Sequence, residues 1–221
     1  MSKLRLAIFD CDGTLLDSQA NIVAAMDACF ARNGLEPPPA NDTRRVVGLS
    51  LPQAMARLLP DHDAGLHDKL ADDYKTVFQA LRAEARLSAE PLYPGTLAAL
   101  DRLAGKGWLF AVATGKSDRG LDHALHDHGI HDRFVSLQTA DRHPSKPHPS
   151  MIERALADAG VDAMDAVMIG DTSFDMQMAV NAGVRALGVA WGYHAPAELV
   201  ATGAETVADD YAALADYMLR A

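Results

Sequence analysis

Residues 8–18 read IFDCDGTLLDS, and the rest of the chain is interpreted outward from this stretch. The apolar run over residues 4–9 predicts a buried strand. Two carboxylates follow it, Asp10 and Asp12, two positions apart and just before a Gly-Thr turn. Side chains two apart on an extended segment point the same way, so both carboxylates can face one small volume. Such a pair needs a cation or a proton to neutralise it. The alternative is that the second aspartate and the glycine after it only form a turn.

Length and composition restrict the class of protein. The 221 residues fit one domain with a large insertion, or two unequal domains. The formal net charge of -10 argues against a nucleic-acid or anionic-membrane surface. Cys11 and Cys29 are too few for a disulfide framework, and no apolar run has membrane-spanning length. We therefore expect a reduced, cytoplasmic protein, monomeric or homodimeric, without nucleic-acid or membrane partners.

The periodicity of apolar residues changes twice along the chain. Between residues 18 and 88 it is helical throughout, with helices predicted over 18–33, 42–47, 50–59 and 66–87. After residue 91 helices alternate with short apolar runs, which predict strands at 108–113, 134–139, 166–170 and 185–190, and a short edge strand at 205–207. Such alternation predicts an α/β fold, a Rossmann-like parallel sheet with helices on both faces. Residues 1–17 and 89–221 would form this core, and residues 18–88 an inserted all-helical cap.

Polar groups follow four of the predicted strands or their loops: Asp10 and Asp12; Thr114, Gly115 and Lys116; Lys146; Asp171 and Asp175. The carboxyl ends of parallel strands meet at one edge of the sheet, so these groups are expected to converge. Several carboxylates together favour Mg²⁺, which prefers oxygen ligands. A threonine and a glycine at a helix N-terminus can hold a phosphate, and a lysine adds a point charge. Together these are the parts that phosphoryl transfer needs.

Four motifs, in this order, carry a resemblance to a known family. They are DCDGT at 10–14, VATG at 112–115, KPHP at 146–149 and GDTSFD at 170–175. The chain resembles the haloacid dehalogenase superfamily, in the branch of phosphoglycolate phosphatases and β-phosphoglucomutase. The helical block over 18–88 lies where that branch carries its helical cap.

The resemblance assigns roles to the residues of these motifs. Asp10 would be the nucleophile that forms an aspartyl-phosphate, and Asp12 would protonate the leaving oxygen and then activate water. Mg²⁺ would be held by the Asp10 carboxylate, the main-chain carbonyl of Asp12 and Asp171. Asp175 would orient the lysine or a metal-bound water. The transferring phosphoryl oxygens would be held by Thr114, Gly115 and Lys146.

Several other residues have two interpretations. Arg44 and Arg45 either contact the rest of an anionic substrate or form a solvated helix face. Lys116 either reaches the substrate or faces water. Residues 191–194 are expected to close the core rather than bind a ligand. The histidines of the polar region at 123–131 lack metal-site spacing, so no metal is expected there; they are His123, His126, His128 and His131.

The function predicted by these features is a Mg²⁺-dependent phosphatase acting on a small phosphorylated metabolite, with phosphoglycolate as first candidate. The insertion would close over the site and hinge near residues 16–20 and 88–94. The alternatives are a phosphosugar mutase and a non-catalytic phosphate-binding protein. A dehalogenase is disfavoured because those relatives need no Mg²⁺ and lack the second aspartate.

Overall fold

The computed structural model describes residues 4–220 and contains a six-stranded parallel sheet in the order β3-β2-β1-β4-β5-β6. The strands are β1 Arg5–Phe9, β2 Trp108–Thr114, β3 Ser136–Thr139, β4 Ala166–Gly170, β5 Arg185–Val189 and β6 Thr206–Ala208. This is a doubly wound order, and it reverses between β1 and β4. Ligands of open α/β sheets bind in the crevice at that reversal, beyond the carboxyl ends of the strands. The predicted α/β fold with a parallel sheet is confirmed.

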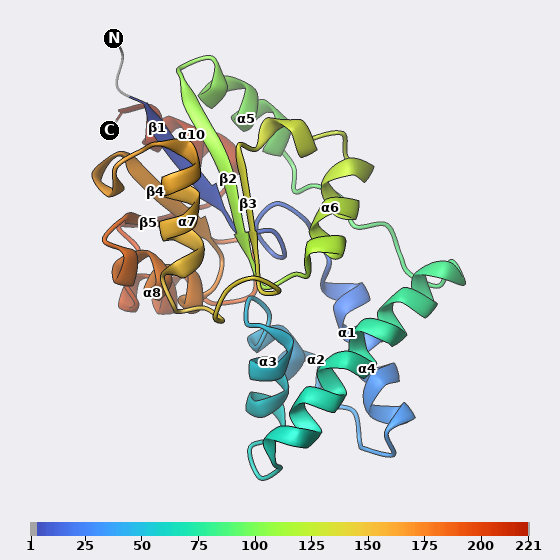
Figure 1. Cartoon of the computed structure of the whole chain (residues 1–221). Coiled ribbons are helices and arrows are strands. Elements are labelled where there is room, and N and C mark those ends of the chain that lie inside the picture. Colours follow the sequence, from blue (N-terminus) through green and yellow to red (C-terminus); the bar gives the residue numbers. More distant parts are fainter. Residues whose placement is uncertain (1–3, 221) are drawn as a thin grey trace.

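Helices cover both faces of the sheet (Figure 1). Alternate residues of β1 explain this, because successive side chains of a strand point to opposite faces. Ala7 and Phe9 pack against α5, α6 and α10, whereas Leu6 and Ile8 pack against α7, α8 and α9. The bounds of these helices are α5 Thr96–Ala104, α6 Asp118–Asp127, α7 Ser150–Ala159, α8 Ser173–Ala182, α9 Pro196–Ala201 and α10 Tyr211–Arg220.

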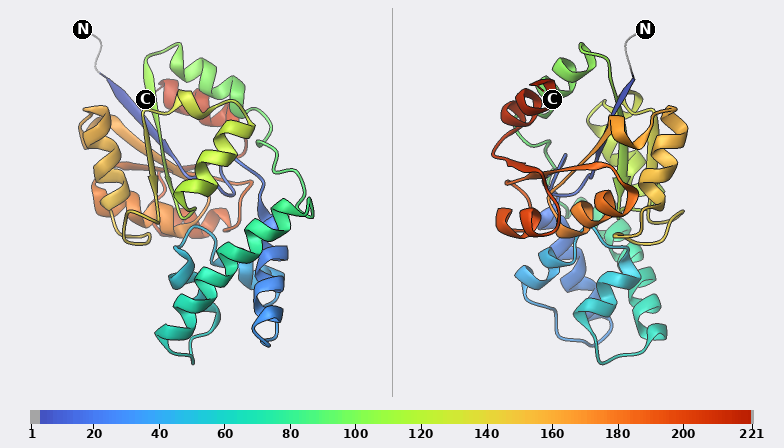
Figure 2. Two further views of the ribbon diagram at one scale, coloured as in Figure 1. Left: turned by 45° about the vertical axis from the view of Figure 1, so that its right-hand side comes forward. Right: turned by 90° about the vertical axis from the view of Figure 1, so that its left-hand side faces the viewer.

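Four further helices form the helical insertion, which we define as α1 to α4. They are α1 Gln19–Arg32, α2 Ala40–Arg45, α3 Leu51–Leu58 and α4 Ala64–Ala83. The insertion has its own apolar cluster, built around Met26, Phe30, Met55, Leu70 and Tyr74. Both views of Figure 2 place it beyond the sheet, at the end where β1 and β2 finish.

The two segments that join the insertion to the sheet run side by side. Asp17 N donates to Pro91 O over 2.9 Å. The Asn21 amide bonds both backbone groups of Ser88, donating to its carbonyl at 2.9 Å and accepting from its N–H at 2.8 Å. A paired connection of this kind ties entry and exit of the insertion to one point.

Element boundaries differ from the predicted ones by a few residues. Helix α4 ends at Ala83 rather than Leu87, and Ala85 has a positive φ of 54°, which ends the helical path. Helix α9 is not predicted, because its six residues are too few to show a period. Within residues 4–220, none of the helices combines the length and the apolar character that a membrane span requires.

Candidate active site

The acidic groups that follow β1 and β4 meet at the reversal of the strand order. Asp10 directly follows β1, and its backbone N–H donates to Ile169 O of β4 over 2.9 Å. Asp171 directly follows β4, and Asp175 lies in the first turn of α8. These three fully buried aspartates each offer a carboxylate oxygen within 4.8 Å of the others. Residues about 160 positions apart in the chain therefore form one acidic site, as the strand-end argument predicts.

Lys146 provides positive charge inside this site. Its Nζ lies 2.9 Å from Asp10 Oδ1 and 2.6 Å from Asp175 Oδ1, and its side chain is fully buried. Burial alone would lower the pKa of Lys146, but the neighbouring Asp10 and Asp175 carboxylates outweigh it and raise the pKa. The lysine is therefore a fixed ammonium group.

Asp175 is held by its own helix. Its Oδ2 accepts hydrogen bonds from the Thr172 backbone N–H at 3.0 Å and from Thr172 Oγ1 at 2.7 Å, while its Oδ1 accepts from Lys146. The Thr172 side chain in turn accepts from Asp175 N, which completes a capping box at the start of α8. Both carboxylate oxygens of Asp175 are thus used by the protein, so its contacts suit a residue that orients the lysine.

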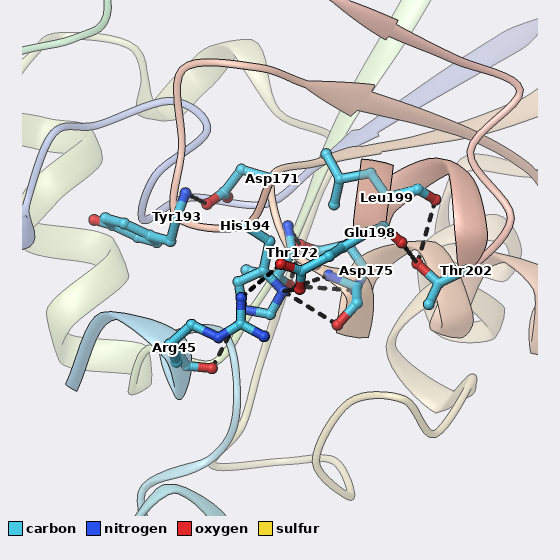
Figure 3. Close-up of polar contacts among 10 residues, drawn as sticks. Arg45, Asp171, Thr172, Asp175, Tyr193, His194, Glu198, Leu199 and Thr202 are labelled. Carbon is cyan, nitrogen blue, oxygen red and sulfur yellow. Dashed lines mark hydrogen bonds and ion pairs between the residues drawn. The ribbon is translucent and has the colours of Figure 1, made fainter. Parts of the chain in front are cut away.

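Asp171 is held from two sides. Its Oδ1 accepts from Thr14 Oγ1 at 2.8 Å. Its Oδ2 accepts from the backbone N–H of Tyr193 at 2.9 Å (Figure 3). Gly13 has a φ of +84°, and a Cβ there would lie 2.3 Å from Asp171 Oδ2. Only glycine allows the loop after β1 to pass this close to the carboxylate.

The site carries more negative charge than Lys146 balances. Burial, with Asp175 and Asp12 nearby, raises the pKa of Asp10 to about 7 even though Lys146 opposes the shift. Burial, with Asp10 and Asp175 nearby, raises the pKa of Asp171 well above its usual range. Asp10 Oδ1 is paired with Lys146 Nζ, whereas Asp10 Oδ2 has no hydrogen-bond donor within residues 4–220. Clustered carboxylate oxygens, one of them without a donor, fit a divalent cation such as Mg²⁺.

The Asp12 side chain is not one of the three clustered aspartates and instead lines a cavity. Its Oδ1 lies 2.7 Å from Lys116 Nζ and accepts a hydrogen bond from Ser18 Oγ. Burial opposes the charge on Lys116, but Asp12 outweighs it and raises the pKa of Lys116. Lys116 therefore contacts the second aspartate and lines the same cavity, rather than facing open water.

Thr114 is the last residue of β2, and Gly115 follows it and lines this cavity. Thr114 is 1% exposed, and its Oγ1 accepts from the Lys116 N–H at 3.3 Å. A Cβ on Gly115 would lie 2.6 Å from Leu49 O and 2.8 Å from Gly48 O. The glycine is therefore required by the close approach of the helical insertion to the sheet, a requirement that the sequence does not reveal.

The arginines of α2 lie elsewhere. Arg45 pairs with Glu198 of α9 at 2.8 Å, and its carbonyl oxygen lies 3.2 Å from His194 Nε2 (Figure 3). Arg45 lines a second cleft together with Phe174, and neither Arg44 nor Arg45 lines the cavity that contains Asp12. The structure therefore does not bring these two arginines to the acidic site.

Residues that sequence reasoning missed act mainly through single contacts. Ser18 bonds Asp12, and Thr14 and Tyr193 bond Asp171. Tyr193 lies in the segment 191–194, which was expected only to close the core. Tyr193 donates through its backbone N–H, which almost every residue type has, so its side chain gives no indication in the sequence of this contact. Thr14 is the only one of the three that lies within a predicted motif.

The histidines after β2 lie at the surface. His126 and His131 approach Asp122 closely enough to share a ligand. His126 Nδ1 already lies 2.8 Å from the Asp122 carbonyl oxygen, and His131 Nδ1 lies 3.1 Å from Asp132 Oδ1. The prediction that this region holds no metal stays a prediction.

Comparison with known proteins identifies the class. A family model described as haloacid dehalogenase-like hydrolase matches residues 7–189. "Probable phosphatase IndB" of Dickeya dadantii is 33% identical over 210 residues, which cover 93% of this chain and 90% of that protein. Phosphoglycolate phosphatase of Agrobacterium fabrum is 32% identical over 211 residues, covering 95% of this chain and 90% of that protein. The crystal structure of a predicted phosphatase from Clostridium acetobutylicum has the same fold, with a TM-score of 0.89 at 23% identity over 100% of both chains.

The chain therefore belongs to the haloacid dehalogenase-like hydrolases. Within that family it is a phosphatase, an enzyme that hydrolyses phosphoric monoesters.

Proposed function

We propose that this phosphatase uses Asp10 as a nucleophile and Mg²⁺ as its cofactor to hydrolyse a small phosphorylated metabolite. The observation that carries the proposal is the state of Asp10. It is a buried carboxylate whose Oδ1 is paired with the ammonium group of Lys146 and whose Oδ2 has no hydrogen-bond donor within residues 4–220. An oxygen without donors retains its lone pairs for attack.

The first half-reaction forms an aspartyl-phosphate on Asp10. One Asp10 oxygen attacks phosphorus, the bond to the leaving oxygen breaks, and Asp12 supplies the proton that the leaving alkoxide needs. Lys116 and Ser18 stabilise the Asp12 carboxylate that results. Lys146, with the Thr114 hydroxyl and the Gly115 backbone, would hold the transferring phosphoryl oxygens, where charge spreads in the transition state.

The second half-reaction returns the enzyme to its starting state. The Asp12 carboxylate takes a proton from water, which attacks the phosphorus and releases Asp10 and inorganic phosphate. Asp10, Asp171 and the Asp12 main-chain carbonyl would hold the Mg²⁺. Bound there, the ion supplies positive charge that lets an anionic nucleophile and an anionic phosphoryl group approach each other.

We further propose that residues 18–88 act as a cap over a core of residues 1–17 and 89–221. Contacts between the insertion and the core support this role. Ser50 N donates to Ser145 Oγ at 2.8 Å, and Lys75 Nζ lies 3.5 Å from Asp141 Oδ1. Closure would exclude bulk water while the aspartyl-phosphate exists. Opening would take place at the paired connections, near residues 16–20 and 88–94.

Phosphoglycolate, the substrate in the names of several relatives, is the first compound to test. The experiment measures inorganic phosphate released from a panel of phosphomonoesters, with Mg²⁺ and with EDTA, by the wild type and by Asp10→Asn. We expect Mg²⁺-dependent release by the wild type alone. Conversion of glucose 1-phosphate to glucose 6-phosphate without phosphate release would instead identify a mutase. Binding without turnover of any ester, p-nitrophenyl phosphate included, would contradict catalysis.

A further inference from the structure

A large cavity opens on the leaving-group side of the proposed site. It has a volume of about 480 Å³ and lies between the helical insertion and the sheet, with Asp12 and Lys116 in its wall. Volumes of about 300–1,000 Å³ are typical of pockets for drug-sized ligands. The leaving group of phosphoglycolate has only two carbons and would leave most of this space to water. The following inference rests on the proposed function, in which Asp12 protonates the leaving oxygen.

Apolar side chains form most of the cavity wall that the insertion provides. They come from α1, α4 and the segment between α2 and α3, and include Ile22, Met26, Val46, Leu49, Tyr74 and Phe78. Tyr74 and Phe78 lie one turn apart on α4, with their ring centroids 6.0 Å apart. Aromatic side chains in a wall favour a ring-containing ligand, because rings stack or meet edge to face.

The insertion also contributes polar side chains to the cavity wall, namely Lys75, Gln79 and Arg82 of α4 and Thr43 of α2, and of these only Thr43 is fully buried. Thr43 of α2 lines the cavity, is 0% exposed, and its Oγ1 has no hydrogen-bond partner within residues 4–220. A buried hydroxyl without a partner is costly, so such groups in native proteins usually have an explanation. A ligand atom that hydrogen-bonds the Thr43 hydroxyl would supply the missing partner.

We infer that this cavity binds the leaving group of a phosphomonoester whose alcohol carries an aromatic or heteroaromatic ring, with a polar ring atom bonded to Thr43. The ring lies against Tyr74 and Phe78, and the ester oxygen lies at Asp12. The preferred substrate is therefore larger than phosphoglycolate and carries a ring in its leaving group.

Three alkyl phosphates of similar leaving-group acidity test the size and the character of the substrate. They are ethyl phosphate, 2-phenylethyl phosphate and 2-(pyridyl)ethyl phosphate, compared with phosphoglycolate. In a hydrophobic pocket even one methylene changes specificity by about 10–200-fold. We therefore expect kcat/KM to rise at least about tenfold from ethyl to 2-phenylethyl phosphate. Equal values for these two esters, or the highest value for phosphoglycolate, would overturn the inference.

Variants of the wall localise the effect. Phe78→Ala is expected to reduce the 2-phenylethyl to ethyl ratio of kcat/KM, while Thr76→Ala, an exposed position of the same helix outside the cavity wall, leaves that ratio unchanged. Thr43→Val keeps the shape and removes the hydroxyl, so it should abolish any preference for the pyridyl over the phenyl ester. Its melting temperature should not fall, because the hydroxyl has no partner to lose. A pyridyl preference that survives Thr43→Val would remove the proposed role of Thr43.

A binding measurement separates this inference from the proposed function. Calorimetry with the Asp10→Asn variant compares the affinities of 2-phenylethyl and ethyl phosphate without turnover. Tighter binding of the phenyl ester supports the cavity even if no ester is hydrolysed by the wild type. Hydrolysis of all esters, with equal affinities in this variant, leaves the proposed function intact and contradicts the cavity assignment.

Discussion

The acidic site and the cavity beside it are built on different principles. In the acidic site most polar atoms have a protein partner: Asp175 has three donors, Asp171 two, and Lys146 two carboxylates. The cavity wall is mostly apolar, and its Thr43 hydroxyl has no partner among the described residues. The acidic site is suited to chemistry that needs fixed geometry. In the cavity, the Thr43 hydroxyl remains available for a hydrogen bond to a ligand.

The largest effect is expected from Asp10→Asn. The substitution removes the nucleophile, and loss of a group central to covalent catalysis lowers kcat by about 10⁴-fold or more. Because the variant side chain is neutral in a site that disfavours charge, the melting temperature should not fall. Phosphate release and thermal denaturation measure the two quantities. Activity near the wild-type level would exclude the covalent mechanism.

A large loss of stability is expected from Lys146→Met. The substitution leaves Asp10 and Asp175 buried without their counter-charge, and breaking a buried ion pair in this way costs about 3–5 kcal/mol. Lys75→Met, which breaks an exposed pair with Asp141, should cost about 1 kcal/mol or less. Denaturant unfolding at pH 7 gives both values. Similar costs for the two variants would show that the buried lysine is not held by its carboxylates.

Gly115→Ala tests the contact between the insertion and the sheet. Its Cβ would meet the carbonyl oxygens of Gly48 and Leu49, so the insertion must move away from the site. A misplacement of about 1 Å can cost roughly 100-fold in rate, and we expect kcat/KM to fall by about 10–100-fold. Gly105→Ala is the control, because its Cβ would make only ordinary contacts. Unchanged kinetics in Gly115→Ala would mean that this contact does not matter for catalysis.

The smallest effect concerns pH and metal binding. The folded state raises the pKa of Asp10 to about 7, so without metal it retains a proton that the unfolded chain releases near pH ~3.9. This contribution to stability is present at low pH and is lost as the pH rises through about 7, with a slope of at most ~1.4 kcal/mol per pH unit. A divalent cation replaces the proton, so the Mg²⁺-induced rise in melting temperature should grow between pH 5 and pH 8. A rise that does not depend on pH would contradict this.

Much of the acidic site could be predicted because it follows from local rules. The alternation of strands and helices after residue 91 indicates a parallel sheet, and parallel strands bring their carboxyl ends to one edge. Asp10 and Asp171 directly follow neighbouring strands, so their meeting needs no knowledge of side-chain packing. The prediction that Arg45 contacts the substrate did not rest on a rule of this kind. A helix face alone does not tell which partner it will meet, and Arg45 pairs with Glu198, 153 residues away.

The amino-acid sequence by itself determined the α/β sheet, the helical insertion and the order of the acidic and basic groups at the strand ends. The reason is that side-chain periodicity and strand direction are local properties. Only the tertiary structure decided that Lys116 faces Asp12, that the Tyr193 backbone holds Asp171, and that the Thr43 hydroxyl is buried in an apolar wall. These contacts join segments distant in the chain, and they depend on how the insertion packs against the sheet.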